Sequence, residues 1–299
     1  MPNVKANGLD FYYESHGPES AEPILLIMGL GAQMSRWSPD MIAKLVAAGH
    51  RVIAYDNRDV GLTEKLDAAG APDMGAVFAA VREHRKAPVA YTLDEMAADA
   101  AGLLGALGIE RAHIVGASMG GMIAQLVAAD HPGKTLSLTS IMSSTGNPEL
   151  PRATPEAMAR LSTPTPDPNK DLDAFLDSAV TGAKVMAGTY PIDEALVRAN
   201  SLSDFKRSYY PVGFQRQYAG ILASPDRRPK LKTIAAPTVV IHGDADPLVP
   251  VDGGRDTAAN IPGAELIVVP GVGHEMPAAV LDVFVDGILS AVARAKVSA

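Results

Sequence analysis

The sequence contains no cysteine. Disulfide bonds, a thiolate nucleophile and cysteine–zinc sites are therefore excluded, and a reducing compartment suits the chain. The first eight residues also lack the apolar core of a secretory signal peptide. We therefore expect the protein to be cytoplasmic.

Basic residues are fewer than acidic residues. The 299 residues include 34 acidic and 26 basic side chains, which gives a formal net charge of −8. This charge would repel a polyanion, so nucleic acid is not an expected partner. Hydrophobic residues make up 47% of the chain, enough for one large α/β domain with room for an insertion.

No apolar run is convincing as a membrane span. The most apolar long window, residues 112–129, approaches transmembrane length but contains His113, Ser118, Gln125 and several glycines. A buried strand followed by a turn and a helix explains this window better than a span does.

Short apolar runs alternate with helical stretches along most of the chain. The predicted strands are residues 11–14, 24–28, 52–56, 112–115, 136–141, 237–241 and 264–269. Predicted helices include residues 41–48, 92–107 and 279–293, the second with a threonine–glutamate capping box. This alternation predicts a parallel sheet wound by right-handed crossovers, with residues 11–14 at an antiparallel edge.

The pattern changes between residues 147 and 232. Prolines cluster at positions 148, 151, 155, 164, 166 and 168, strands disappear, and helical stretches follow at 172–186 and 205–222. We interpret residues 147–230 as a helical cap inserted between two strands. The core domain then consists of residues 1–146 and 231–299.

The run Gly116-Ala117-Ser118-Met119-Gly120 is the most informative motif. It lies between an apolar strand and a helix, and a turn this sharp requires small residues two positions on either side of the serine. The turn raises the Ser118 hydroxyl above the end of the sheet, where a base can reach it.

Two later loops supply partners for this hydroxyl. Asp246 lies in Gly243-Asp244-Ala245-Asp246-Pro247, and His274 ends Gly271-Val272-Gly273-His274; each loop follows an apolar run. The carboxyl ends of parallel strands share one sheet edge, where sites of open α/β sheets lie. A histidine there can take the serine proton, and an aspartate can orient the imidazole.

A third loop at the same edge, Met28-Gly29-Leu30-Gly31, follows the apolar run at residues 24–27. The backbone N–H groups of Leu30 and Met119 are candidates to hold the oxyanion of a tetrahedral intermediate.

Several residues have less specific interpretations. Asp244 competes with Asp246, but it begins its loop and is expected to cap a turn. The polar turn around Arg58 is expected to form a structural network rather than to contact substrate. His113 and His242 fall at strand ends and are expected in the core or the pocket wall.

The motifs G-A-S-M-G, D-N-R-D-V-G-L-T, G-D-A-D-P-L-V-P and G-V-G-H together resemble the α/β-hydrolase superfamily over essentially the whole chain. The resemblance implies a mostly parallel eight-stranded sheet flanked by helices, with the cap inserted before the acid-bearing strand. It also implies a triad of Ser118, Asp246 and His274, with Leu30 and Met119 at the oxyanion positions.

Met28-Gly29 stands where the superfamily usually has His-Gly. In this respect the chain is similar to the branch that contains aclacinomycin methylesterase, which hydrolyses a carboxylic methyl ester on a polyketide. Haloalkane dehalogenases and epoxide hydrolases use an aspartate nucleophile, and Ser118 argues against both activities.

Candidate pocket residues come from both parts of the chain. Aromatic side chains of the insertion either attach it to the core or form an apolar roof over a substrate. The candidates for pocket walls are Met34, Trp37, Met142, Tyr209, Tyr210 and Phe214.

These observations predict a carboxylic ester hydrolase that forms an acyl-enzyme on Ser118 and needs neither cofactor nor metal. The expected partner is a small-molecule ester; the sequence leaves the oligomeric state open. The same triad also serves acyl transfer, perhydrolysis, lactone opening and C–C hydrolysis. A ligand receptor that has lost turnover is the alternative of a different class.

Overall fold

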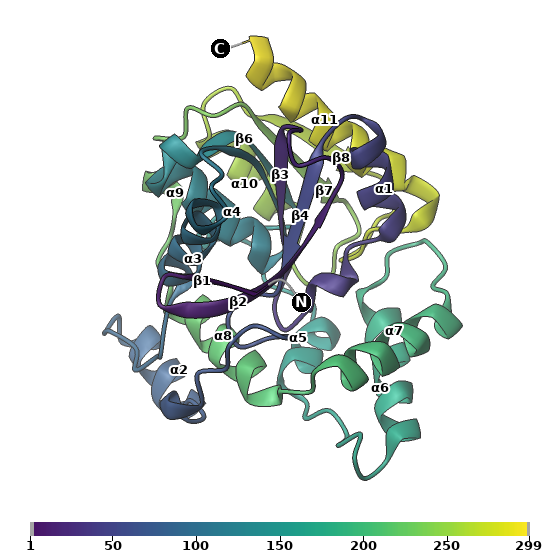
Figure 1. The fold of residues 1–299 in the computed structure, drawn as a ribbon. Coiled ribbons are helices and arrows are strands. Elements are labelled where there is room, and N and C mark those ends of the chain that lie inside the picture. Colours follow the sequence, from purple (N-terminus) through teal and green to yellow (C-terminus); the bar gives the residue numbers. More distant parts are fainter. Residues whose placement is uncertain (1–2, 298–299) are drawn as a thin grey trace.

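The computed structural model describes residues 3–297, and an eight-stranded sheet forms its centre (Figure 1). The spatial order is β1-β2-β4-β3-β5-β6-β7-β8. The strands are β1 (Asn3–Ala6), β2 (Leu9–His16), β3 (Pro23–Ile27), β4 (Arg51–Tyr55), β5 (Ala112–Ala117), β6 (Thr135–Ile141), β7 (Thr238–Gly243) and β8 (Glu265–Val269). The pairs β1–β2 and β2–β4 are antiparallel and the other pairs are parallel, which confirms the predicted fold class.

Helices cover both faces of the sheet because its central strands are apolar on both sides. In β3, Leu25 and Ile27 enter one core, whereas Ile24 and Leu26 enter the other. The first core packs against α3 (Leu93–Ala106) and α4 (Met119–Asp130), and the second against α1 (Pro39–Ala47) and α11 (Leu281–Val297). Figure 1 shows these two pairs of helices on opposite sides of the sheet.

Local sequence signals explain where several helices begin. Thr92 and Glu95 form the predicted capping box at the start of α3. Pro39 occupies the first turn of α1, where a missing N–H costs nothing. The structure also contains β1 and the helix α2 (Met74–Arg82), neither of which the sequence analysis predicted.

The helical insertion lies between β6 and β7. It comprises α5 (Pro155–Ser162), α6 (Leu172–Met186), α7 (Glu194–Arg207), α8 (Pro211–Ala223) and the short α9 (Arg228–Leu231). The prediction of α6 is confirmed, but that of one helical stretch over 205–222 is wrong. The helix is interrupted at residues 208–210, because Pro211 disfavours helical geometry in the residue before it.

Buried polar contacts attach the insertion to the core. Arg216 on α8 pairs with Asp59 at 2.7 Å, and both side chains are almost completely buried. Arg207 at the end of α7 pairs with Asp56, also at 2.7 Å. The turn around residues 56–59 is therefore a docking point for the insertion.

Among the helices that the structure describes, none combines the length and apolar character needed to cross a membrane.

Candidate active site

Ser118 lies in the sharp turn between β5 and α4. Its φ of 55° and ψ of −121° lie in a region that side chains rarely adopt. A Cβ atom on Gly116 would lie 2.0 Å from the Gly120 carbonyl oxygen, and one on Gly120 would lie 2.0 Å from that of Ile27. Both positions therefore require glycine, and the turn leaves Ser118 partly exposed.

The structure brings the three predicted triad residues together. His274 Nε2 lies 3.0 Å from Ser118 Oγ, and His274 Nδ1 lies 2.7 Å from Asp246 Oδ2. Asp246 follows β7 and His274 follows β8, so both reach Ser118 from the carboxyl edge of the sheet. Each contact is within hydrogen-bonding distance.

Backbone groups hold the Asp246 carboxylate in place. Its Oδ1 accepts hydrogen bonds from the N–H groups of Leu248 at 2.9 Å and Val249 at 2.8 Å, which leaves Oδ2 for His274. Burial alone would raise the pKa of Asp246. Hydrogen bonds from His242 and His274, with the charge of His274, outweigh burial and lower that pKa to about 2. The carboxylate is therefore ionised at neutral pH.

Asp244 has a different role from Asp246. Its carboxylate accepts a hydrogen bond from the backbone N–H of Gly271 at 2.6 Å, so it joins the two loops that carry Asp246 and His274. The structure thus separates the two candidate acids: Asp246 contacts the imidazole and Asp244 caps the neighbouring turn.

His242 lies beside the triad, whereas its position in the sequence predicted only a place in the pocket wall or the hydrophobic core. The side chain is fully buried, and its Nε2 lies 2.7 Å from the Val249 carbonyl oxygen and 3.5 Å from Asp246 Oδ2. The signal available in the sequence was its place at the end of the acid-bearing strand, four residues before Asp246.

The predicted oxyanion turn packs directly against the serine. A Cβ on Gly29 would lie 3.2 Å from Ser118 Cβ, so this glycine allows the close approach. Met119 is the first residue of α4, where backbone N–H groups lack helical partners and the helix dipole favours negative charge. Leu30 lies on the turn itself and is partly exposed.

Side chains outside the triad hold this turn. Gln217 on α8 is fully buried; its Oε1 accepts from the Gly31 N–H at 2.8 Å, and its Nε2 donates to the Arg58 carbonyl at 2.8 Å. Asn57 Nδ2 donates to the Met28 carbonyl at 2.8 Å. No local pattern in the sequence marks Gln217, because its partners are more than 150 positions away in the chain.

The turn around Arg58 forms the structural network that the sequence indicated. Arg58 Nη2 donates to Asp99 Oδ1 at 2.7 Å, and the guanidinium lies over the Tyr91 ring, 4.8 Å from its centroid. Asp99 also accepts from Asn7 Nδ2 at 2.7 Å. These contacts join helix α3 to the turn and leave Arg58 only 7% exposed.

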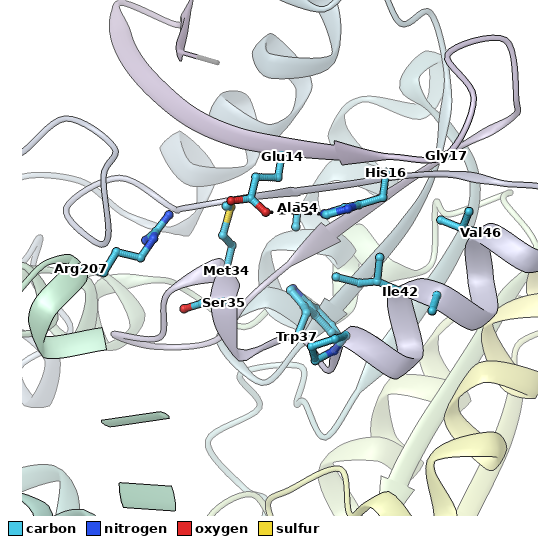
Figure 2. A pocket seen from close by; sticks show the side chains of 12 residues that line it. Glu14, His16, Gly17, Met34, Ser35, Trp37, Ile42, Val46, Ala54 and Arg207 are labelled. Carbon is cyan, nitrogen blue, oxygen red and sulfur yellow. Dashed lines mark ion pairs between the residues drawn. The ribbon is translucent and has the colours of Figure 1, made fainter. Parts of the chain in front are cut away.

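The candidate pocket residues lie in different places. Met34 and Trp37 line a cavity of about 470 Å³ whose lining contains no triad residue (Figure 2). Figure 2 shows Arg207 at one end of that cavity and the ion pair of Glu14 and His16 across it from Trp37.

The other candidates come from β6 and the insertion. Phe214 lies beside the oxyanion turn, because a Cβ on Gly31 would meet its ring at 2.6 Å. Met142, with φ of 42°, follows β6 and is 4% exposed. Tyr209 packs edge-on against Phe205, and the Tyr210 hydroxyl bonds to Asp67 and Arg216.

Comparison with known proteins identifies the family to which this fold belongs. A family model described as the alpha/beta hydrolase fold matches residues 22–277. The chain belongs to the alpha/beta hydrolase fold family. The matched residues include the strands β5, β7 and β8 and the loops after them, which carry the triad candidates. The helical insertion also lies within the matched range.

Similar proteins include several named hydrolases. This α/β-hydrolase is 28% identical to rhodomycin D methylesterase DnrP of Streptomyces peucetius, with 89% of each chain covered. It is 29% identical to the putative carbamate hydrolase RutD of Variovorax paradoxus over 96% of this chain and 97% of the relative. The first similarity confirms the resemblance to the methylesterase branch.

Solved structures show the same fold at lower identity. The meta-cleavage product hydrolase CumD of Pseudomonas fluorescens aligns with a TM-score of 0.76 at 20% identity, covering 99% of this chain and 98% of that one. The esterase EaEST of Exiguobacterium antarcticum aligns with a TM-score of 0.73 at 21% identity, covering 96% and 97%.

Proposed function

We propose that the protein is a serine hydrolase that cleaves carboxylic esters through an acyl-enzyme on Ser118. One observation carries the proposal: a single imidazole, His274, lies 3.0 Å from the Ser118 hydroxyl and 2.7 Å from the Asp246 carboxylate. This is the geometry in which an aspartate fixes the tautomer of a histidine that then accepts a serine proton.

In the first half-reaction, Ser118 Oγ attacks the ester carbonyl carbon while His274 Nε2 takes the hydroxyl proton. The carbonyl oxygen becomes an oxyanion, and the N–H groups of Leu30 and Met119 are its proposed donors. The imidazolium then gives its proton to the departing alcohol oxygen as the C–O bond breaks. Asp246 remains ionised throughout, consistent with its lowered pKa.

In the second half-reaction, water replaces the alcohol. His274 removes a proton from the water, which attacks the acyl carbon and forms a second oxyanion. Collapse of this intermediate releases the carboxylic acid and returns the proton to Ser118 Oγ. No other reactant is needed, because water supplies both the hydroxyl and the proton.

The insertion is proposed as a cap over this site. Phe214 lies beside the oxyanion turn, and the backbone N–H of His274 donates to the Met186 carbonyl at 2.8 Å, so both α8 and the end of α6 reach the catalytic loops. We therefore retain residues 147–230 as the cap and assign it the wall that faces the acyl or alcohol group. The named methylesterase relative makes methyl esters the first substrates to test.

The proposal is tested by hydrolysis of p-nitrophenyl acetate and of aromatic methyl esters by the wild type and Ser118→Ala. The variant is expected to lose nearly all turnover while keeping the wild-type melting temperature. Ser143→Ala is the matched control, because its hydroxyl is buried and has no hydrogen-bond partner within residues 3–297. Full activity of Ser118→Ala would refute the proposal.

Product analysis separates hydrolysis from other uses of the same triad. The carboxylic acid is expected to be the main product even when an alcohol, hydrogen peroxide or a lactone is added. A new ester, a peracid or preferential ring opening would instead identify acyl transfer, perhydrolysis or lactone opening as the activity.

A further inference from the structure

A second cluster of polar side chains lies at the edge of the sheet opposite the triad. Glu22 immediately precedes β3, His50 immediately precedes β4, and His113 is the second residue of β5. These three strands are neighbours in the sheet, so their amino ends bring the side chains together. One oxygen or nitrogen atom from each lies within 4.8 Å of the other two.

The distance between the His113 and Glu22 side chains is close to that between two ligands of one metal ion. His113 Nε2 and Glu22 Oε2 are both buried atoms and lie 3.1 Å apart. Ligands at about 2.0–2.1 Å from a tetrahedral zinc ion lie about 3.3 Å from one another. A metal ion could therefore bind both atoms with little movement of either side chain.

The Nδ1 atoms of both imidazoles have contacts of the kind that metal-binding histidines use. His113 Nδ1 lies 2.8 Å from Ser137 Oγ, and His50 Nδ1 lies 3.2 Å from the Glu22 carbonyl oxygen. A hydrogen bond donated from Nδ1 leaves the lone pair on Nε2 and fixes the ring orientation. The two rings are also packed edge-to-face with centroids 5.9 Å apart.

We propose that Glu22, His50 and His113 form a binding site for a divalent transition-metal ion of the zinc class. Two neutral imidazoles and one carboxylate are a donor set that zinc accepts, with water as the fourth ligand. The histidines are 4% and 1% exposed, whereas Glu22 is about one-third exposed, so the ion enters from the Glu22 side. This proposal departs from the expectation that the chain binds no metal.

The ion has a structural role and not a catalytic one. His113 is the second residue of β5, and Ser118 follows the end of that strand, five residues later, which corresponds to about 16 Å along an extended chain. The cluster instead joins the starting points of β3, β4 and β5. Binding to the folded state alone would therefore stabilise the centre of the sheet.

Lys296 limits the affinity of this site. Its ammonium lies 3.5 Å from Glu22 Oε2, and its side chain is 60% exposed on the last turn of α11. A bound cation would repel this ammonium, which can move into solvent because the side chain is long and exposed. Removing the charge is therefore expected to tighten metal binding.

The test is calorimetric titration of the full-length protein with zinc chloride. The wild type is expected to bind one ion per chain and to melt a few degrees higher when zinc is about 100 times its Kd. His50→Gln and Glu22→Gln are each expected to weaken binding by about 100-fold or more, since loss of outer contacts alone costs about 10–100-fold. Lys296→Gln is expected to tighten it.

His131→Gln is the matched control, because His131 is the C-terminal capping residue of α4 and lies outside the cluster. This variant is expected to bind zinc like the wild type. Ester hydrolysis should be unchanged by saturating zinc and by His50→Gln, which separates this test from that of the proposed function. Absence of stoichiometric binding would overturn the proposal and leave a buried His113–Glu22 ion pair. Binding that survives both ligand substitutions, or that inhibits hydrolysis, would place the ion elsewhere and also overturn it.

Discussion

Replacement of Asp246 by asparagine tests the role of the acid more sharply than its removal does. The asparagine Oδ1 can still accept the backbone N–H groups of Leu248 and Val249, so the side chain keeps its position. Its amide NH₂ then faces His274 Nδ1, where the carboxylate now lies at 2.7 Å. The imidazole must accept there, which places its proton on Nε2 and leaves no lone pair to receive the Ser118 proton.

The expected loss follows from this change of tautomer. An asparagine at the corresponding place in a serine–histidine–aspartate triad lowers kcat about 10⁴-fold. At about 1.36 kcal/mol for each tenfold change, the loss corresponds to about 5 kcal/mol of transition-state stabilisation. KM is expected to change little, because Asp246 is buried behind the imidazole and does not reach the substrate.

Steady-state hydrolysis of p-nitrophenyl acetate measures this effect, with Asp244→Asn as the matched control. Asp244 accepts one hydrogen bond, from the Gly271 N–H, and an asparagine oxygen can do the same. The control is therefore expected to remain within about threefold of wild type. If Asp246→Asn lost less than about tenfold, or if both variants lost the same activity, the assigned tautomer mechanism would be refuted.

Three further predictions concern the scaffold around the triad. Gln217→Leu removes the acceptor of the Gly31 N–H and should lower kcat on the order of tenfold with little change in KM, measured beside its melting temperature. Gly120→Ala should lower the free energy of unfolding, measured in urea, by about 3 kcal/mol or more, because the new Cβ would lie 2.0 Å from a carbonyl oxygen. Gly105→Ala is its control and should not destabilise the fold, because no atom lies within 4 Å of the position of the new Cβ. The pKa of Asp246 falls from 3.8 to about 2 on folding. About 2 kcal/mol of the free energy of unfolding is therefore present above pH 4 and lost as the pH falls towards 2. Urea unfolding at several pH values should show that Asp246→Asn lacks this part of the pH dependence.

Much of the site could be predicted because its constraints are local. The glycines at 116 and 120 permit only one kind of turn, and each loop that carries a triad candidate follows an apolar strand. Parallel strands end at a common edge, so these local signals are sufficient to bring Ser118, Asp246 and His274 to one place.

Other features depend on packing between distant segments. Gln217 contacts the turn at residues 28–31 only because α8 packs against that turn, and no local sequence pattern marks the contact. The edge strand β1 has only four residues, of which two are exposed, one is half-buried and one is buried, so its apolar signal is weak. The break before Pro211 was visible as a proline in the sequence, but the aromatic residues on both sides favoured one continuous helix.

The most direct test of the central claim is covalent labelling with a fluorophosphonate, followed by mass spectrometry of the digested protein. An activated serine is expected to carry one label per chain, on the peptide that contains Ser118. Labelling should fall sharply in His274→Ala, because the hydroxyl loses the base that lies 3.0 Å away. Stoichiometric labelling at another residue, or undiminished labelling of Ser118 without His274, would contradict the account.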